Sequence, residues 1–559
     1  MKYPAQRLTF IFSAQSKSTG VLALAFTALV TGCSSIQSES DADPHYRLTL
    51  LHTNDHHGRF WKNSHGEYGM AARKTLIDQI RAEVEEEGGQ VLLLSGGDIN
   101  TGVPESDLQD AEPDFKGMRH LGYDAMAVGN HEFDNPLDII RQQQEWAGFP
   151  FLAANIYDSN TGERLFEPYK VFDLDGLKVA VIGLITEDTK KLGNPEFMGD
   201  IEFSLPSVEA AVLVPELKKK SDIVIAATHM GHYDNAAYGV NAPGDVSLAR
   251  RVSGIDIIVG GHSQDPVCMS AENLSNMAYQ AGDPCLPDSQ NGTLIMQAHE
   301  WGKYVGRADL EYQDGELTLL SYQLIPVNLK KKVKNAEGKS ERVLVAEAIP
   351  EDAGMLDFLQ PFQDQGQDEL NIPIGNVDDR LEGDRSVVRF QPTNLGHLIA
   401  TAQMEKVKAD LAVMNSGGIR DSIEAGEITY KEVLMVQPFS NTVASVDLTG
   451  KELMEYLSIV ASKPVDTGAF AQFAGVALEI VDGKLTNALV GNKPIDSDHV
   501  YRLAVNSYIA AGGDGYPDLS SHPGYVNSGF VDAEVLKTFL SQHSPIQASD
   551  YDNQAIQRL

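Results

Sequence analysis

Five apolar runs in the first half of the chain each end in polar side chains that stand beside glycine or beside one another. The runs have the length of β-strands, and helix-like stretches such as Met70–Glu87 and Ser207–Lys220 lie between some of them. In open α/β folds, the polar groups at the C-terminal ends of strands gather in one site, and glycine lets the backbone turn sharply there. The five junctions are Asp55-His56-His57-Gly58, Gly96-Gly97-Asp98, Gly129-Asn130-His131-Glu132-Phe133-Asp134, Thr228-His229-Met230-Gly231-His232 and Gly260-Gly261-His262-Ser263-Gln264.

The alternation of strand-like and helix-like segments predicts the fold class. A chain that alternates in this way packs helices against sheets, so we expect an α/β domain built from layers. The apolar runs that precede the junctions are Arg47–Asn54, Val91–Leu94, Ala125–Val128, Asp222–Ala227 and Ile255–Val259, and two further runs of the same kind are Lys178–Ile185 and Thr293–Met296.

The side chains at the junctions are types that bind divalent metal ions. Carboxylate, imidazole and amide oxygen together favour Zn, Mn or Mg and provide no soft thiolate site. Their number exceeds one four-coordinate site. Two ions about 3.5–4 Å apart can hold both the attacking and the leaving oxygen of a displacement at phosphorus. Each motif alone is more often a capped turn or a loop, but five of them in order at strand ends predict a metal centre.

In this order the motifs resemble those of the metallophosphoesterases. More closely, the mature chain is similar to the bacterial 5′-nucleotidases, including those that also split UDP-sugars. The resemblance implies a four-layer αββα sandwich of two sheets between helices. It also implies a separate C-terminal α/β substrate-binding domain, joined by a helical linker that acts as a hinge and carries the bound nucleotide to the metals.

The resemblance also assigns roles at the strand ends. It implies two divalent ions (Mg, Mn, Zn or Co) that lower the pKa of a water molecule and so supply the nucleophile. His131 would sit near the substrate phosphate, where it stabilises charge or protonates the leaving oxygen, and Asp134 would orient its imidazole. His56 and His232 receive no role beyond structure. The implied ligands are Asp55, His57 and Gln264 for one ion, Asn130, His229 and His262 for the other, and Asp98 as the bridge.

The second half of the chain carries the residues implied for the substrate. Three arginines match positions that contact phosphate or carboxylate-like groups, although scattered arginines are usually surface charges. Two aromatic residues match a pair that stacks on the nucleobase, although most aromatic residues lie in cores. Many relatives have Phe where Tyr508 stands, and its hydroxyl could alter base preference. The implied set is Arg385, Arg389 and Arg420 for phosphate, Phe439 and Tyr508 for stacking, Asn441 for the base and Asp514 for the ribose hydroxyls.

The N-terminus predicts export and a lipid anchor. Basic residues and then a short apolar run, Val21 to Val30, precede Cys33 with no Asp or Glu before it, which is typical of a signal peptide. The run is too short to span a bilayer as a helix, which takes about 20 residues. Val30-Thr31-Gly32-Cys33 resembles the bacterial lipobox, and Ser34 favours transfer to the outer membrane, on its periplasmic or cell-surface face. The alternative is a plain signal peptide with an incidental Cys.

Cysteine number agrees with this interpretation. The chain has three Cys, and lipidation of Cys33 leaves Cys268 and Cys285 as a pair that can form a disulfide in an oxidising compartment. The alternative is two free thiols. We divide the chain into a signal peptide (1–32), a lipidated Cys with a tether (33–45), a catalytic domain (46–345), a linker helix (346–371) and a nucleotide-binding domain (372–559).

The charge of the chain restricts its partners. Lys and Arg number 44 against 79 Asp and Glu, a net charge of −35, which opposes binding to polymeric nucleic acid. We expect small-molecule nucleotides and a membrane as partners, and no obligate protein partner. Local positive charge from metals and arginines has to outweigh the distant field, so added salt would help an anionic nucleotide approach, and a specific chloride requirement is one further expectation.

Together these features predict a secreted, lipid-anchored 5′-nucleotidase that hydrolyses AMP, ADP, ATP and similar nucleotides for salvage. Two alternatives use the same scaffold, namely a UDP-sugar hydrolase and a 2′,3′-cyclic phosphodiesterase. An alternative of another class is a surface lipoprotein that binds nucleotides without catalysis, which leaves His131 and Asp134 without a purpose.

Replacing Cys33 by Ser tests the lipid anchor. We expect the Cys33→Ser protein to leave the membrane fraction, because each buried CH₂ of an acyl chain contributes about 0.8 kcal/mol to anchoring. The measurement is the share of the protein that sediments with membranes, with Ser35→Ala as the control. A Cys33→Ser protein that stays membrane-bound contradicts the anchor.

Overall fold

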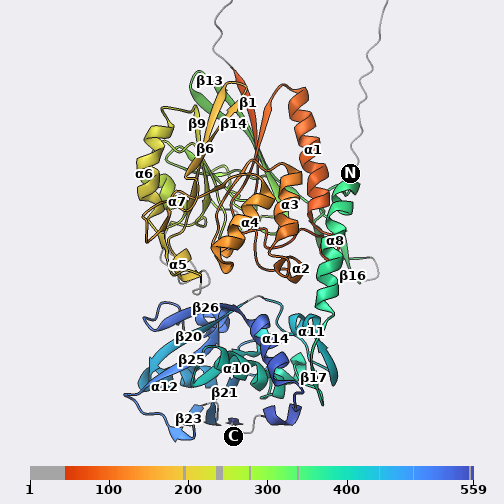
Figure 1. Cartoon of the computed structure of the whole chain (residues 1–559), viewed down its shortest axis with the longest axis vertical. Helices are drawn as coiled ribbons and strands as arrows, with labels where there is room; N and C mark the ends of the chain where they lie inside the picture. Colours follow the sequence, from red (N-terminus) through yellow and green to blue (C-terminus); the bar gives the residue numbers. More distant parts are fainter. Residues whose placement is uncertain are drawn as a thin grey trace, which may run out of the picture. The chain divides into compact units, whose positions relative to one another are not determined.

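The computed structural model describes residues 45–192, 197–234, 243–275, 279–335, 339–439, 441–482, 484–552 and 556–558. Residues 44–559 form one compact unit that contains all the hydrophobic cores described below (Figure 1). The predicted signal peptide and Cys33 lie outside the described residues. Within the described residues, the helices are too short or too polar to cross a membrane.

The catalytic domain contains two six-stranded sheets. Apolar residues that alternate along these strands bury both faces of each sheet, as expected for strands packed between layers. The first sheet has the order β14 (Glu316–Pro326), β13 (Tyr304–Gln313), β1 (Tyr46–Thr53), β2 (Gln90–Ser95), β3 (Ala125–Ala127) and β4 (Phe151–Leu152). The second has the order β11 (Asp288–Gln290), β12 (Thr293–Met296), β10 (Ile257–Val259), β9 (Ile223–His229), β7 (Leu177–Ile185) and β6 (Tyr169–Leu174).

The two sheets pack face to face, and helices cover their outer faces. Leu48 and Leu50 of β1 share one buried cluster with Val179 of β7 and Ile225 of β9, so the inner faces meet. Leu51, which follows Leu50, points the other way and packs with the helices over the first sheet. The expected four-layer αββα sandwich is therefore present. Its helices are α1 (Met70–Glu86), α2 (Pro104–Asp107), α3 (Glu112–Leu121), α4 (Leu137–Ala147), α5 (Thr189–Leu192), α6 (Pro206–Leu217) and α7 (Asp245–Arg251).

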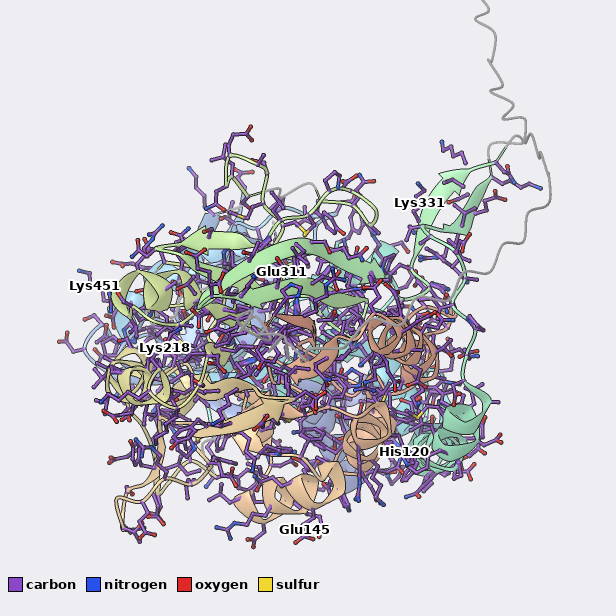
Figure 2. The ribbon with its side chains drawn as sticks, turned by 90° about the horizontal axis from the view of Figure 1, so that it is seen from above. His120, Glu145, Lys218, Glu311, Lys331 and Lys451 are labelled. Atoms are coloured by element: carbon purple, nitrogen blue, oxygen red, sulfur yellow. A yellow bond between two sulfur atoms is a disulfide. The ribbon has the colours of Figure 1, made fainter. Side chains whose placement is uncertain are left out.

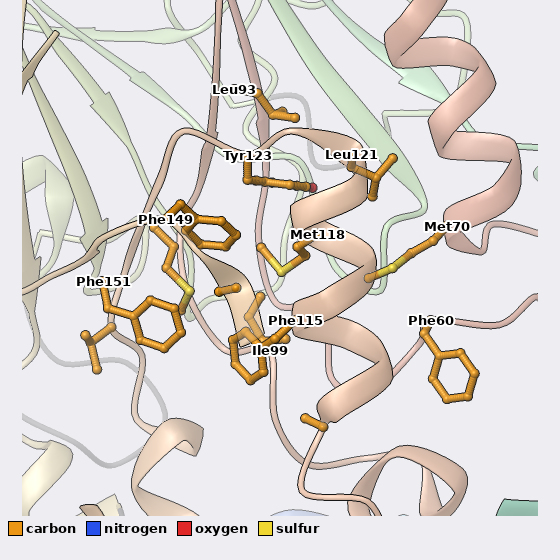
Figure 3. Packing of buried hydrophobic residues seen from close by; sticks show 14 of the residues in the cluster. Phe60, Met70, Leu93, Ile99, Phe115, Met118, Leu121, Tyr123, Phe149 and Phe151 are labelled. Atoms are coloured by element: carbon orange, nitrogen blue, oxygen red, sulfur yellow. The ribbon is translucent and has the colours of Figure 1, made fainter. Parts of the chain in front are cut away.

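The core on the outer face of the first sheet is rich in large side chains. Phe115 and Met118 of α3 pack with Met70 of α1, and the Phe115 and Phe151 rings lie 5.3 Å apart between centroids (Figure 3). The linker helix α8 (Ala353–Leu370) buries Met355 and Leu359 in the same cluster. A helix lies within the predicted linker 346–371, over Ala353–Leu370, and its first turns belong to the core of the catalytic domain.

The polar, lysine-rich stretch before the linker helix is folded into strands. Strand β14 continues through the buried Tyr322, and the lysines form strand β15 (Lys330–Lys334), which pairs with β16 (Ser340–Leu344). Periodicity of two residues in the polar sequence Glu316–Pro326 was the signal, because only one face of this edge strand is buried. A short ladder of β5 (Ile156–Asp158) and β8 (Ile201–Phe203) completes the domain.

The C-terminal domain is a second α/β unit. Its central sheet has the order β21 (Ala471–Ala474), β18 (Leu411–Asn415), β25 (Val500–Asn506), β20 (Thr442–Thr449) and β26 (Tyr525–Val531). Helices α10 (Asn394–Lys406) and α14 (Asp532–His543) pack on one face and α12 (Gly450–Ala461) on the other, which gives two cores. The remaining elements are β17 (Pro373–Val377), α9 (Arg385–Val388), β19 (Gly426–Thr429), α11 (Tyr430–Val436), β22 (Val476–Val481), β23 (Lys484–Val490), β24 (Lys493–Pro494), α13 (Ser507–Ala510) and β27 (Ile556–Arg558).

Cys268 and Cys285 form the disulfide that the cysteine count suggested. Both residues are buried, and they belong to the core between the two sheets. The bridge closes a loop of sequence separation 17 between β10 and β11. Closing such a loop restricts the unfolded chain, which stabilises the fold by roughly 3 kcal/mol in the chain-entropy model.

Candidate metal centre and nucleotide cavity

The strand-end loops of the catalytic domain hold the metal-type residues in an unusual backbone conformation. Asp55, His57, Asp98, His262 and Gln264 have φ values of 51°, 51°, 56°, 80° and 56°. Side chains other than glycine adopt this left-handed region rarely, and they persist there where the surrounding structure enforces it. Five of the seven predicted ligands share this feature, so the loops are shaped by tertiary contacts and not by local preference.

One group of ligands gathers around Asp98 on the side of strand β9. Asp98 Oδ2 lies 3.0 Å from His229 Nε2, and His229 Nε2 lies 3.1 Å from Asn130 Oδ1. His262 Nδ1 lies 2.9 Å from the same Asn130 oxygen. Asp98, His229 and His262 therefore direct ligand atoms to one point that could hold a metal ion.

A second group lies on the other side of Asp98. His57 Nε2 is 3.9 Å from Asp98 Oδ2 and 3.9 Å from Asp55 Oδ1. The Gln264 amide lies 2.8 Å from His57 Nε2. These contacts link all seven predicted ligands in one continuous cluster, and Asp98 belongs to both groups, as a bridging ligand must. His131 also directs a ring nitrogen toward His57 and Asp98.

Backbone carbonyls orient two of the imidazoles. His229 Nδ1 donates to Gly96 O at 2.7 Å, and His57 Nδ1 donates to Thr101 O at 2.9 Å. A carbonyl can only accept, so each ring carries its proton on Nδ1 and turns Nε2 toward the cluster. A hydrogen bond from the ring nitrogen that faces away from the cluster to a backbone carbonyl is typical of metal-binding histidines.

The charges in the cluster are also suited to cations. Burial raises the pKa of Asp55 to about 7. Burial would also raise the pKa of Asp98, but His229 and His131 outweigh it and hold that pKa well below its usual range. Burial would lower the pKa of His229, but Asp98 raises it to about 9. A ligand imidazole must be neutral, so a cation has to displace this proton. The oxygen and nitrogen donors fit the divalent ions that the sequence predicted.

His131 and Asp134 form the predicted pair beside the cluster. His131 Nδ1 donates to Asp134 Oδ2 at 2.6 Å, and the Thr101 hydroxyl donates to the same oxygen at 2.6 Å. Burial would lower the pKa of His131, but Asp134 and Asp98 raise it to about 10. The carboxylates thus favour the protonated imidazole, and its Nε2 is the ring nitrogen left for a substrate.

In the C-terminal domain, one cavity of about 430 Å³ collects six of the seven predicted substrate residues. Phe439 and Tyr508 are 54% and 46% exposed, so they are not the core aromatic residues of the alternative interpretation. The Arg420 guanidinium lies 5.4 Å from the Phe439 ring centroid. Arg385 is not among the residues that line this cavity. The lining residues are Arg389, Asn415, Gly417, Gly418, Arg420, Phe439, Asn441, Gly468, Tyr508 and Asp514.

The two domains match two known sequence families. Residues 48–266 match the calcineurin-like phosphoesterase family, and residues 373–521 match the C-terminal domain of 5′-nucleotidases. The chain is 63% identical over 535 residues to a 5′-nucleotidase of Vibrio parahaemolyticus, with 95% of each chain covered. It is 58% identical over 535 residues to Protein UshA of Escherichia coli, with 95% of this chain and 97% of the relative covered. The chain belongs to the 5′-nucleotidase family.

Solved structures have the same fold. The 5′-nucleotidase precursor of Thermus thermophilus has a TM-score of 0.55 at 31% identity, over 92% of this chain and 99% of the other. The NAD nucleotidase of Haemophilus influenzae has a TM-score of 0.68 at 22% identity, over the same shares of the two chains, which supports the fold alone. The family assignment thus agrees with the order of motifs from which the sequence analysis began.

In this member of the family, Glu132 ties two ligand loops together, a role that the sequence analysis missed. Its buried carboxylate accepts from the backbone N–H of Ile99 at 2.8 Å and of Gly129 at 2.6 Å, and from the Asn100 side chain at 3.1 Å. Ile99 follows the bridging Asp98, and Gly129 precedes Asn130. Because backbone N–H groups of two strand-end loops donate to one carboxylate, Glu132 fixes the distance between the ligands that these loops carry. Its place in the motif was the only signal in the sequence.

Asn415 and Asn506 are further residues that the sequence analysis missed. Asn415 Nδ2 donates to Asp514 Oδ2 at 2.9 Å, and Asn506 Nδ2 donates to Asn415 Oδ1 at 2.9 Å. They stand at the ends of β18 and β25, so the rule that polar groups gather at strand ends would have found both. The two unassigned histidines are structural: His56 Nε2 lies 2.8 Å from Asp114 Oδ1, and His232 Nε2 lies 2.9 Å from Asp288 Oδ2.

The hydroxyl of Tyr508 turns toward Asp514. It donates to Asp514 Oδ1 at 3.2 Å, while Asn415 donates to the other oxygen of that carboxylate. The sequence analysis allowed this hydroxyl an effect on base preference. The contact connects the ring of Tyr508 to the residue implied for the ribose hydroxyls.

The Glu132→Gln variant tests the role of Glu132. An amide has one oxygen where the carboxylate has two, so its NH₂ group would face a backbone N–H of one ligand loop. We expect bound metal and kcat to fall about 10- to 100-fold, the usual cost of losing a group that orients ligands. The measurements are metal content and kcat, with the exposed Glu145→Gln in α4 as the control. Full metal content with unchanged kcat contradicts this role.

The Tyr508→Phe variant tests the hydroxyl contact. Removing a hydrogen bond to Asp514 costs about 1 kcal/mol, so we expect KM for AMP to rise roughly fivefold while kcat stays near its original value. The preference for AMP over 2′-deoxy-AMP should change as well, because Asp514 becomes less restrained. The control is Tyr312→Phe in the catalytic domain. Unchanged KM and unchanged preference would show that the hydroxyl has no part in binding.

Proposed function

We propose that this enzyme hydrolyses the phosphate of 5′-nucleotides such as AMP, ADP and ATP, and that seven side chains hold two divalent ions for the reaction. Membership of the 5′-nucleotidase family makes it a metal-dependent phosphoric monoester hydrolase. The observation that supports the two-ion arrangement is the position of Asp98, whose carboxylate lies between two groups of ligands. Mg, Mn, Zn and Co all suit this set of donors.

When bound, the two ions would lower the pKa of a water molecule and neutralise charge on the phosphate. Asp55, His57 and Gln264 would hold one ion, Asn130, His229 and His262 the other, with Asp98 shared, since this division follows the contacts around Asp98. Five of the seven ligands are buried, namely Asp55, His57, Asp98, Asn130 and His229, which would strengthen electrostatic interactions in the site.

His131 would supply the proton for the leaving group. In the reaction a water oxygen bonds to phosphorus, the bond from phosphorus to the 5′ oxygen breaks, and the nucleoside oxygen needs a proton. The Nδ1 proton of His131 is held by Asp134, so the proton on Nε2 is the one available. The same charged ring would also attract the phosphate before the reaction begins.

The C-terminal cavity would bind the rest of the nucleotide. Two exposed aromatic faces, Phe439 and Tyr508, suit the two sides of a nucleobase, because stacking tolerates any base. Asn441 would meet the edge of the base. The Asp514 carboxylate has acceptor capacity left for ribose hydroxyls after its contacts with Tyr508 and Asn415. Arg389 and Arg420, with Arg385 nearby, would attract phosphate.

The location of the enzyme is a separate proposal. Cys33 would carry lipid and hold the enzyme at the outer membrane, where it would release nucleosides from external nucleotides for salvage. The support is the lipobox-like Val30-Thr31-Gly32-Cys33 after a short apolar run, together with a disulfide between the remaining two cysteines.

Chloride would affect how anionic substrates approach this acidic protein. Comparing chloride with sulfate at equal ionic strength separates a specific effect of chloride from general screening of charge.

Phosphate release from AMP tests the function. We expect the enzyme to release phosphate, to stop when a chelator removes the metals, and to recover when single metals are added back. The His131→Ala variant should keep its metals and lose about 100- to 10,000-fold in kcat, because general acid catalysis contributes about 3–5 kcal/mol.

The exposed His120→Ala is the matched control for His131→Ala. A panel that adds UDP-glucose and a 2′,3′-cyclic nucleotide to AMP, ADP and ATP separates the proposed activity from the two alternatives on the same scaffold. A protein that binds AMP and releases no phosphate with any metal would instead be a binding protein, and the proposal would be wrong.

A further inference from the structure

A basic hairpin stands out on this acidic protein. Strands β15 and β16 pair only with each other, in a two-stranded sheet that is separate from the two catalytic sheets. Lys331, Lys332, Lys334 and Arg342 are exposed on it. Figure 2 marks Lys331 on this hairpin, where its strands lie at the margin of the ribbon.

The charge of the hairpin is opposite to that of the rest of the chain. Residues 330–343 contain six basic and two acidic residues, a net charge of +4. The other residues contain 38 basic and 77 acidic ones, a net charge of −39. The general excess of acidic residues in the sequence does not explain a segment with a net positive charge.

Three of the four exposed basic side chains share a face, and Lys331 lies on the opposite one. Alternation along a strand puts Lys332 and Lys334 on one side, and the register places Arg342 directly opposite Lys332. Like charges directly opposite each other destabilise a strand pair. Among the described residues, Lys331, Lys332, Lys334 and Arg342 form no ion pair with a carboxylate, so nothing described there offsets this repulsion.

The base of the hairpin is held in place. The Lys330 backbone N–H donates to Glu67 Oε1 at 2.8 Å, the Lys330 ammonium contacts His65 O, and Val345 N donates to Leu329 O at 2.9 Å. Lys330 is thus used by the fold, while Lys331, Lys332, Lys334 and Arg342 have no ion-pair partner among the described residues. The chain holds a set of unneutralised positive charges on a fixed base.

We propose that this hairpin binds the anionic phosphate groups of a membrane surface. Clusters of four or more basic residues near a bilayer bind acidic lipids, and each contributes to the attraction only within about 10 Å of the surface. Screening over that distance removes most of the repulsion from the distant acidic residues. A long nucleic acid is a poorer partner, because it would lie along the acidic remainder of the surface.

The predicted anchor would keep the compact unit near a membrane. If Cys33 carries lipid, residue 44 lies at most about 40 Å from the anchored residue, since an extended chain spans about 3.6 Å per residue. The hairpin would then give the tethered enzyme a second contact with the bilayer. The two contacts are independent, so the hairpin can be tested on residues 44–559, the compact unit that lacks the anchor.

The test is binding of residues 44–559 to vesicles of phosphatidylcholine alone, or with phosphatidylglycerol as about a third of the lipid. The variant is Lys331→Gln, Lys332→Gln and Lys334→Gln together. The matched control is Lys218→Gln, Lys219→Gln and Lys220→Gln, which removes the same charge from a second run of lysines. Two lysines of that run already pair with Asp256 and Glu216.

We expect the unaltered unit to bind the acidic vesicles and to leave them in about 1 M salt. The hairpin variant should bind roughly 100-fold more weakly, at about fivefold per lysine, while the control variant binds as before. All three proteins should hydrolyse AMP equally, which separates this proposal from the proposed function. No preference for acidic vesicles, an equal loss in the control, or binding to single-stranded DNA in place of vesicles would overturn the proposal.

Discussion

The site depends on one buried carboxylate, Asp98, that two groups of ligands share. Its oxygen atoms lie within reach of His57 on one side and His229 on the other. The imidazoles hold its pKa well below the usual range, so it remains charged although it is buried. A charged carboxylate this deep in a protein is stable only with positive charge beside it, and the divalent cations that the family implies would provide it.

The strained loops around Asp98 show how the fold serves that carboxylate. Left-handed backbone at Asp55, Asp98 and His262 costs energy in isolation, and the layers of sheet and helix supply the stability that maintains it. Glu132 connects two of these loops through backbone N–H groups, which restricts the spacing of their ligands. The site is therefore preorganised, which is what electrostatic catalysis requires.

The same principle recurs in the C-terminal domain with a different carboxylate. The Asp514 carboxylate accepts hydrogen bonds from Asn415 and Tyr508. These contacts join the ends of β18 and β25 to the stacking ring. In both domains, a carboxylate at strand ends organises its neighbours through hydrogen bonds. The basic hairpin follows another principle, since its charges have no such partners among the described residues and face outward.

The sequence by itself determined the fold class, the order of the strand ends and the identity of the metal-type residues. Strand-like runs that alternate with helix-like segments indicate layers of sheets and helices. Motifs such as Gly-Asn-His-Glu indicate metal chemistry from their residue types alone. It also pointed to the disulfide through cysteine number.

Only the tertiary structure decided that Glu132 clamps two loops, that Tyr508 faces Asp514, that Arg385 stays outside the cavity and that the lysine-rich stretch is a hairpin. Each of these depends on residues distant in sequence that meet through sheet pairing or loop packing. A hydrogen bond between such residues leaves no periodic pattern in the chain, because its partner is chosen by the fold.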